Sequence, residues 1–362
     1  MYIPISMEIY SKISPDDLLG RNTEHLYSSQ ASELIFNKVI LVTGAGGSIG
    51  SEIVRQVTGL GAKRVYCVDQ DEFALYQLQL NTVGSALLTD SNLILADIRN
   101  REVMDQIFSD VKPDIVFHAA ANKHLPLLER SPASAITTNV LGTSNIANVC
   151  LKHNVKVFIN ISTDKAARPS SVLGFTKRLA EYCVSNIVGK SEMRVASVRF
   201  GNVLGSRGSF LPTLAWQIEA GKTVMLTDPE TTRFFMTIRE ASALVIEASV
   251  LASEGETFVL DMGNPIKITD IIERYVRLTN SEMPEILVTG MRPGEKLHEE
   301  LFDPSEVYSA TAHPRISKVK VNEKTSVTED RISELLSQIS INVTPDYLKE
   351  KLVGFFGESV KI

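Results

Sequence analysis

The sequence contains few cysteines and no long apolar segment. Only three of its 362 residues are cysteines, and Cys67, Cys150 and Cys183 lack metal-ligand spacing. Their apolar surroundings predict buried thiols in a reducing cytoplasm. No run reaches the roughly 18 to 20 apolar residues of a membrane-spanning helix, and the N-terminus lacks the basic and apolar regions of a signal peptide. We therefore expect a soluble, cytoplasmic protein with no membrane span.

The net charge of the chain is also small. The net charge of -6 at pH 7 gives no general attraction to nucleic acid or to an anionic membrane, so we expect neither as a partner. Local basic patches could still bind a phosphorylated ligand. The length and the balanced composition suit two domains, or one large α/β domain that carries a lobe.

What the sequence does contain is a glycine-rich turn between a strand and a helix. The stretch 38–56, KVILVTGAGGSIGSEIVRQ, places an apolar β-rich run before the turn and a helix after it. The strict G-x-G-x-x-G pattern fails, but G-x-x-G-x-x-G fits and meets the same needs: a turn, close approach of backbone to a pyrophosphate, and tight helix packing. Three glycines alone also occur in ordinary loops. The cofactor-binding residues predicted here are Gly44, Gly47, Ser48, Ile49 and Gly50.

The next strand ends in an acidic residue. Asp69 follows the run 64–68 at roughly the distance expected for a carboxylate that binds the adenosine ribose hydroxyls. Asp71 and Glu72 come soon after, so a 2'-phosphate would meet only negative charge. The sequence therefore predicts NAD rather than NADP as the cofactor.

Strands and helices alternate from there on. Repeated βα units with short connections predict an α/β fold, a Rossmann-type doubly wound parallel sheet with ligands at the carboxyl ends of its strands. At those ends, Asp97 and Ile98 are expected to meet the adenine edge, and the small Ala119 and Ala120 to let the cofactor backbone pass. The expected strands are 38–43, 64–69, 93–96, 115–118, 155–161 and 195–200.

The pattern divides the chain into four parts. Residues 1–37 form a leader that packs on the outside of the domain or on a partner subunit, and 38–200 form the NAD-binding domain. Residues 201–317 form a smaller substrate lobe interleaved with the sheet domain, and 318–362 form a helical tail. Amphipathic periodicity predicts two packing helices in that tail, at 328–339 and 345–355.

The stretch 157–178, VFINISTDKAARPSSVLGFTKR, carries the predicted catalytic residues. A strand delivers Thr163, Asp164 and Lys165 to the top of the sheet, and Lys177 follows on the next helix. Leu173 lies one turn before Lys177, and a leucine cannot transfer a proton. Adjacent residues in an extended or turn conformation point in different directions, so the Asp164 carboxyl and the Lys165 amine could act on one substrate atom from two sides. A solvated loop pair is the alternative interpretation.

Further stretches support a resemblance to a known family: HAAANKHLPLLE (118–129), RFGNVLGSRGSFLP (199–212), DPETTRFFMTIREA (228–241) and MRPGEKLHEEL (291–301). With the glycine loop and STDKA, they resemble UDP-N-acetylglucosamine 4,6-dehydratases of bacterial polysaccharide biosynthesis, which are extended short-chain dehydrogenase/reductase proteins. The chain looks like the catalytic part of the long membrane-attached forms. Many members have a tyrosine at the position of Leu173, whereas the long forms and some capsule enzymes have methionine and use the Asp-Lys pair.

The resemblance implies the chemistry. Carbon 4 of the sugar is oxidised by NAD, while Asp164, helped by Thr163 or a water, accepts the hydroxyl proton. Lys165 then removes the proton on carbon 5 and Asp164 assists loss of the 6-hydroxyl, with retention at carbon 5. Lys177 holds the nicotinamide ribose. Lys165 must be partly neutral to act as a base, which we expect a desolvated site beside Lys177 to promote.

Substrate binding is expected from side chains outside the catalytic stretch. Basic residues after a strand and a glycine-broken loop suit a sugar diphosphate, arginines offer planar forks for phosphate, and a glutamate could accept ribose hydroxyls of uridine. Surface ion pairs are the alternative for the arginines. His118 and His298 are expected to be structural. The predicted substrate-binding residues are Lys123, His124, Asn202, Arg207, Ser209, Arg233, Arg292 and Glu295.

The sequence leaves three other functions open. An inverting dehydratase or a UDP-sugar epimerase would begin with the same oxidation. A catalytically inactive nucleotide-binding protein would explain Leu173, although the presence of Asp164, Lys165 and Lys177 together argues against it. A homo-oligomer is expected, because extended members of this fold often associate through helices.

Overall fold

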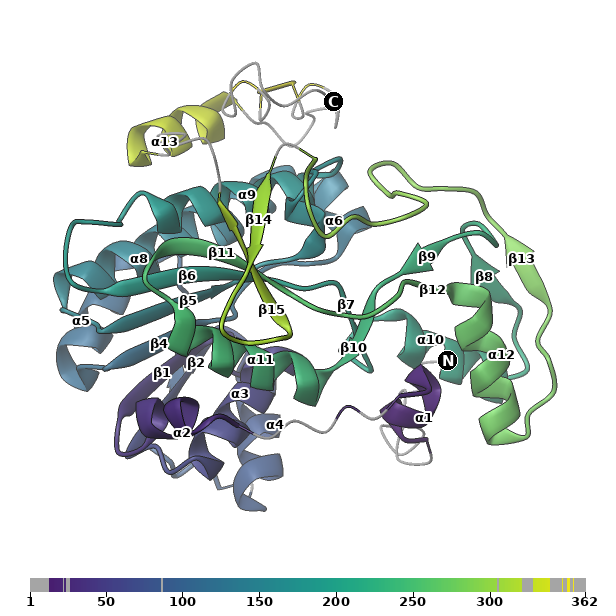
Figure 1. Ribbon diagram of the computed structural model, residues 1–362, viewed down its shortest axis with the longest axis horizontal. Coiled ribbons are helices and arrows are strands. Elements are labelled where there is room, and N and C mark those ends of the chain that lie inside the picture. Colours follow the sequence, from purple (N-terminus) through teal and green to yellow (C-terminus); the bar gives the residue numbers. More distant parts are fainter. Residues whose placement is uncertain are drawn as a thin grey trace.

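The computed structural model describes residues 13–21, 23, 27–85, 87–304, 306–320, 328–338, 347, 350–351 and 354. A nine-stranded sheet lies between layers of helices, and a smaller lobe is attached at one side (Figure 1). This architecture confirms the predicted α/β fold with a Rossmann-type doubly wound sheet.

The central sheet is mostly parallel. Its strands are β1 (Val39–Thr43), β2 (Arg64–Asp69), β3 (Leu93–Leu95), β4 (Ile115–His118), β5 (Val157–Ile161), β6 (Arg194–Arg199), β11 (Glu254–Leu260), β14 (Val307–Ala310) and β15 (Ile316–Lys320). They lie in the order β14-β15-β11-β6-β5-β4-β1-β2-β3, in which β15 pairs antiparallel with both β11 and β14 and the other described pairs are parallel. The connections diverge between β1 and β4, which opens a crevice at the carboxyl ends of the strands. The expected strands all form, and β11, β14 and β15 come from beyond residue 200.

Helices cover both faces of the sheet. On one face α11 contacts α2 and α3, and on the other α8 contacts α5 and α9. The bounds are α2 (Ser29–Ile35), α3 (Ser48–Gly59), α4 (Glu72–Val83), α5 (Arg101–Val111), α6 (Leu125–Arg130), α7 (Pro132–Ala135), η2 (Ile136–Gly142), α8 (Thr143–Lys152), α9 (Val172–Ser185), α11 (Ile238–Leu251) and α13 (Glu329–Gln338). Side chains cap first turns: Ser171 accepts a hydrogen bond from Gly174 N at α9, and Thr237 with Glu240 forms a capping box at α11.

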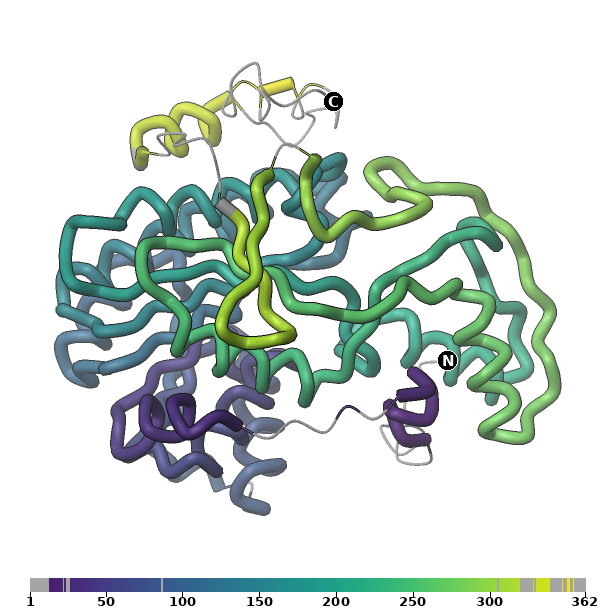
Figure 2. Tube along the Cα trace, in the orientation of Figure 1, coloured from purple at the N-terminus to yellow at the C-terminus, as the bar shows by residue number. Residues whose placement is uncertain are grey.

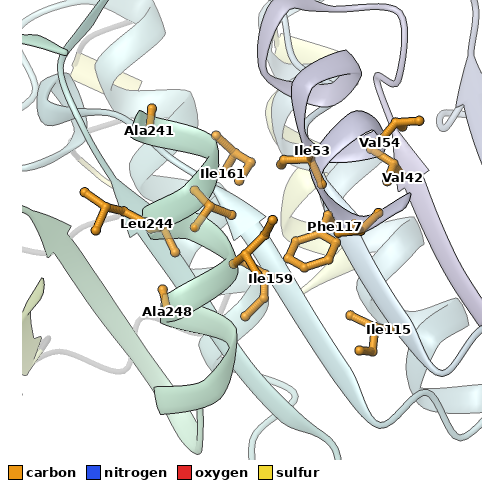
Figure 3. Close-up of a cluster of buried hydrophobic side chains, with 14 of the residues drawn as sticks. Val42, Ile53, Val54, Ile115, Phe117, Ile159, Ile161, Ala241, Leu244 and Ala248 are labelled. Carbon is orange, nitrogen blue, oxygen red and sulfur yellow. The ribbon is translucent and has the colours of Figure 1, made fainter. Parts of the chain in front are cut away.

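Side chains alternate along each strand and so fill two cores. Ile40 and Val42 of β1 pack in the layer of α3 and α11, whereas Leu41 between them packs in the layer of α5 and α8. Phe117 of β4 belongs to the first layer, where it lies beside Ile159 (Figure 3). Burying such a side chain contributes about 1.5 to 3 kcal/mol. These contacts fix the strand ends, and therefore the loops that follow them.

The smaller lobe has its own core. Its elements are α1 (Pro15–Leu19), β7 (Asn202–Leu204), α10 (Phe210–Glu219), β8 (Val224–Leu226), β9 (Thr232–Arg233), β10 (Phe235–Thr237), β12 (Ile266–Lys267), α12 (Ile268–Thr279) and β13 (Ile286–Val288). Leu18 and Leu19 of α1 are buried there with Ile271 and Tyr275 of α12. The trace in Figure 2 shows α1 against this lobe and α2 against the sheet domain. The described part of the predicted leader therefore packs on both parts of the same chain.

The tail contributes one described helix. Ile332 and Leu335 of α13 pack in a cluster with residues of α6, η2 and α9, which agrees with the helix expected at 328–339. Most of the helix expected at 345–355 lies outside the described residues.

Three general expectations can be compared with the structure. Among the described residues, none of the helices combines the length and the apolar character that a bilayer crossing requires. All three cysteines are buried free thiols, as predicted. The same described ranges contain no group of three or more His, Cys, Asp or Glu side chains arranged to hold a metal ion.

Candidate active site

The glycine loop lies at the crevice between β1 and β4. Gly44 has a φ of 65°, and a Cβ there would lie 2.6 Å from the backbone nitrogen of Ala120. A Cβ on Gly50 would lie 2.1 Å from the Gly44 carbonyl oxygen. Only glycine therefore allows the turn to approach the chain after β4 and the first turn of α3 to approach the loop. The N-terminus of α3 faces the crevice, where its free amides favour an anion.

A cavity of about 240 Å³ lies beside this loop. Asp69 stands at its edge, and its carboxylate accepts hydrogen bonds from Gly46 N (2.9 Å) and Asp71 N (3.0 Å). Ile98 also lines the cavity, whereas the Asp97 carboxylate forms a bidentate ion pair with Arg99. That partner lowers the pKa of Asp97. The cavity is lined by, among others, Gly44, Gly47, Asp69, Asp71, Ile98, Ala119 and Ala120.

A larger cavity of about 650 Å³ extends from the glycine loop to the lobe. It brings together residues that are far apart in the sequence. The predicted residues that line it are Gly47, Ser48, Ile49, Gly50, Ala119, Lys123, His124, Thr163, Lys165, Lys177, Asn202, Arg207 and Ser209.

Asp164 lies behind this cavity rather than in its wall. Its side chain is fully buried, and Oδ1 accepts hydrogen bonds from Thr163 Oγ1 (2.8 Å), Lys165 N (2.8 Å) and Lys165 Nζ (3.0 Å). Oδ2 has no hydrogen-bond partner among the described residues. It faces Gly201, where a Cβ would lie 2.8 Å away. Thr163 and Lys165 therefore face the cavity, and Asp164 supports both.

The pKa values of the two lysines of the site are shifted in opposite directions. Burial lowers the pKa of Lys177 to about 8, with Glu181 offsetting part of the effect, and its Nζ donates to Ile161 O (2.6 Å). Burial would also lower the pKa of Lys165, but the Asp164 and Glu299 carboxylates outweigh it and raise that pKa. The expectation that Lys165 is partly neutral is therefore wrong for this structure, because two carboxylates stabilise its ammonium form.

Leu173 occupies the cavity wall one turn before Lys177. Its side chain is apolar and nearly buried, so it contributes shape but no proton transfer. Ser162 does not replace it, because Ser162 Oγ donates to Glu181 Oε1 (2.6 Å), which also accepts from the fully buried Arg199. Thr163 also lines the cavity, and its hydroxyl donates to Asp164, which has no arginine partner among the described residues.

The loop after β7 crosses the crevice. Arg207 lines both cavities, and its backbone N–H donates to Ser48 Oγ (3.0 Å). Lys123 Nζ donates to Ser206 Oγ (3.4 Å), and burial together with Arg207 lowers the pKa of Lys123. A Cβ on Gly208 would lie 2.5 Å from the His124 ring. Arg207 thus lies where the two cavities meet, together with Asp71, and Lys123 lines the larger cavity.

Three predicted substrate residues lie elsewhere. Arg233 Nη1 donates to Thr232 O (2.7 Å) and Leu297 O (3.0 Å), so it supports the backbone of the lobe. Arg292 is exposed and lies 3.8 Å from Glu295. Neither these two nor Arg233 belongs to the described lining of either cavity, and their substrate contacts stay predictions.

Histidines 118 and 298 contact threonines. The ring nitrogens of His118 lie 2.7 Å from Thr43 Oγ1 and 2.9 Å from Thr143 Oγ1, and burial lowers its pKa to about 3. His298 Nδ1 lies 2.8 Å from Thr232 Oγ1. Sequence reasoning missed Glu299, the neighbour of His298, because nothing in the local pattern places it beside Lys165.

Curated relatives cover most of this chain. It is 42% identical over 348 residues to the capsular polysaccharide biosynthesis protein CapD of Staphylococcus aureus, covering 94% of this chain and 57% of that protein. It is 42% identical over 309 residues to the probable polysaccharide biosynthesis protein EpsC of Bacillus subtilis, covering 84% and 51%. The chain thus spans little more than half the length of these relatives. An inverting UDP-N-acetylglucosamine 4,6-dehydratase of Campylobacter jejuni is 32% identical, covering 73% and 78%.

Solved structures and a family model agree with these relatives. Pen from Bacillus thuringiensis superposes with a TM-score of 0.73 at 33% identity, covering 80% of this chain and 89% of that one. The dTDP-glucose 4,6-dehydratase DesIV of Streptomyces venezuelae shares the fold, with a TM-score of 0.62 at 19% identity, covering 73% and 88%. The model of the polysaccharide biosynthesis protein family matches residues 40–321. The chain therefore belongs to the polysaccharide biosynthesis protein family, as its motifs indicated.

Proposed function

We propose that this protein catalyses the NAD-dependent dehydration of UDP-N-acetylglucosamine to a UDP-4-keto-6-deoxy-N-acetylhexosamine, with retention of configuration at carbon 5, for polysaccharide or glycan biosynthesis. One observation carries the proposal. Thr163, Lys165 and Lys177 face a single cavity with the glycine loop, and a buried carboxylate, Asp164, is hydrogen-bonded to the first two.

The smaller cavity fits the adenosine half of NAD. A Cβ at Gly44 would fill the approach to Ala120, so the glycine leaves the room that a pyrophosphate needs. Asp69 lies where ribose hydroxyls would be bound, and Asp69 and Asp71 would repel a 2'-phosphate. When bound, NAD supplies hydride transfer between sugar carbons. Lys177, with its pKa lowered to about 8, is proposed to hold the nicotinamide ribose.

Thr163 and Asp164 are proposed to act in place of the tyrosine that many similar enzymes have at the position of Leu173. The Thr163 hydroxyl faces the cavity and donates to Asp164 Oδ1, so a proton from the 4-hydroxyl can pass through Thr163 to the carboxylate. Protonated Asp164 can then assist departure of the 6-hydroxyl. Lys165 is proposed to remove the carbon-5 proton, which becomes acidic once carbon 4 is a ketone.

The substrate diphosphate is proposed to lie where the two cavities meet. Lys123 and Arg207 bring positive charge there, and His124, whose pKa is lowered by burial and by Lys123, offers an imidazole. Ser209 Oγ is buried without a hydrogen-bond partner among the described residues, and it lies at the N-terminus of α10, where phosphate binding is favoured. Asn202 completes this wall. Arg233, Arg292 and Glu295 remain proposed contacts for the phosphate or the uridine ribose.

Incubation with UDP-N-acetylglucosamine in deuterated water, followed by proton NMR, tests the proposal. We expect a 4-keto-6-deoxy product with deuterium at carbon 5, and ring couplings that show retention. Couplings of the opposite configuration would favour the inverting reaction named for the Campylobacter relative. A 4-epimer would favour an epimerase, and intact substrate with bound NAD would favour an inactive binding protein. Light scattering on the same sample tests the expected homo-oligomer.

A further inference from the structure

The segment that follows β13 returns from the lobe to the catalytic residues. Thr232 N donates to Leu297 O (3.1 Å), which ties the segment to β9. Lys296 Nζ donates to Arg168 O (2.6 Å), which ties it to the loop after Lys165. Glu299, which follows these two attachments in the chain, is turned inward: its side chain is 5% exposed, compared with 42% for the adjacent Glu300.

Glu299 contacts the amine of Lys165. Oε1 of Glu299 lies 3.5 Å from Lys165 Nζ, which also lies 3.0 Å from Asp164 Oδ1 and 3.4 Å from Asn202 Oδ1. Arg233 is the further charged group that acts on this amine, and it disfavours the ammonium form. Glu299 does not belong to the described lining of the cavity, so any effect on a substrate passes through Lys165.

The ammonium form of Lys165 cannot act as a base. To remove the carbon-5 proton, Lys165 must first lose one of its own, because an ammonium has no free electron pair. The two carboxylates keep that proton on the resting amine. Once Asp164 has received the proton of the 4-hydroxyl through Thr163, its carboxyl is neutral. Glu299 is then the carboxylate that still contacts Lys165 and can accept a proton.

We propose that Glu299 is a positioning residue that takes the proton of Lys165 during the elimination and returns it afterwards. This inference rests on the function proposed above. An N–H bond of the Lys165 ammonium breaks and an O–H bond forms on Glu299, which leaves a neutral amine. The amine takes the carbon-5 proton while Asp164 gives its proton to the departing hydroxyl, which leaves as water. The ammonium later reprotonates carbon 5, and the Glu299 proton returns to the amine.

The variant Glu299→Gln keeps the shape of the side chain but cannot accept a proton. We expect the rate of deuterium exchange at carbon 5 to fall roughly 100-fold near neutral pH. Oxidation at carbon 4 should continue, so the reduced cofactor should accumulate, which is followed by its absorbance. Between about pH 7 and pH 10, the residual exchange should rise by up to about tenfold per pH unit, because solvent then takes the Lys165 proton directly. Glu299→Asp should restore part of the rate.

The matched control is Glu300→Gln, which removes the neighbouring, exposed carboxylate and its ion pair with Arg168 (3.3 Å). Glu300→Gln should show deuterium exchange at carbon 5 at the wild-type rate. Exchange in Glu299→Gln at the wild-type rate, or equally slow exchange at every pH, would overturn the inference. Wild-type enzyme that leaves UDP-N-acetylglucosamine unchanged would refute the proposed function itself, and the inference with it.

Discussion

Replacing Lys177 by methionine should change how the stability of the protein depends on pH. In the folded protein, burial lowers the pKa of this amine from 10.5 to about 8. Below about pH 8, Lys177 is protonated in both the folded and the unfolded states, and the folded state carries the full cost of the buried charge. As the pH rises toward about 10.5, the folded amine is neutral and the cost disappears. The shift corresponds to about 3 kcal/mol.

The measurement is urea unfolding of cofactor-free wild type and Lys177→Met. Methionine carries no such cost, so the free energy of unfolding of wild type should rise relative to the variant by about 2 kcal/mol between about pH 7 and pH 9.5. Loss of the hydrogen bond to Ile161 O affects the variant at both pH values and largely cancels from this change. The exposed Lys63→Met serves as the control, and its difference from wild type should stay constant. The argument would be refuted if the free energies of unfolding of wild type and Lys177→Met differed by the same amount at both pH values.

Three further substitutions test the site. Gly201→Ala would place a Cβ 2.8 Å from Asp164 Oδ2. We expect the free energy of unfolding to fall by about 1 to 3 kcal/mol and kcat/KM to fall roughly 100-fold. The control is Gly59→Ala, whose Cβ meets nothing within 4 Å and which should cause neither loss. Arg207→Ala should weaken the binding of UDP, the diphosphate part of the proposed substrate, about 10- to 100-fold by calorimetry; an unchanged Kd would contradict the substrate contact proposed for Arg207. Asp69→Ala should narrow the preference for NAD over NADP, measured as the ratio of the two dissociation constants, and an unchanged ratio would contradict the assigned role of the carboxylate.

The strands and the glycine loop could be predicted because their signals are local. The apolar run at the start of β1, the glycines after it and the acid at the end of β2 lie within one βα unit. Gly44 and Gly50 are required by contacts of the loop with its own helix and with the adjacent strand end, which the repeated βα pattern already implies. The stretch proposed to be catalytic has a similarly local pattern, since Thr163, Asp164 and Lys165 follow β5 closely and Lys177 lies on α9, the next α-helix.

The protonation state and direction of those side chains could not be predicted in this way. The sequence indicated that Asp164 and Lys165 diverge, but the packing of Gly201 against Asp164 decides which of them faces the cavity. Likewise, nothing in the sequence indicated that the Arg233 guanidinium donates to the backbone at Leu297.

The sequence by itself determined the fold, the position of the nucleotide loop and the residue types available for catalysis, because these depend on short-range patterns. Only the tertiary structure decided that Lys165 rests as an ammonium between Asp164 and Glu299. The pKa of a buried group is set by every charge and by all the solvent-excluding atoms around it. For Lys165 those neighbours include Glu299 and Arg233, which only the packing of the lobe against the sheet domain brings to its amine.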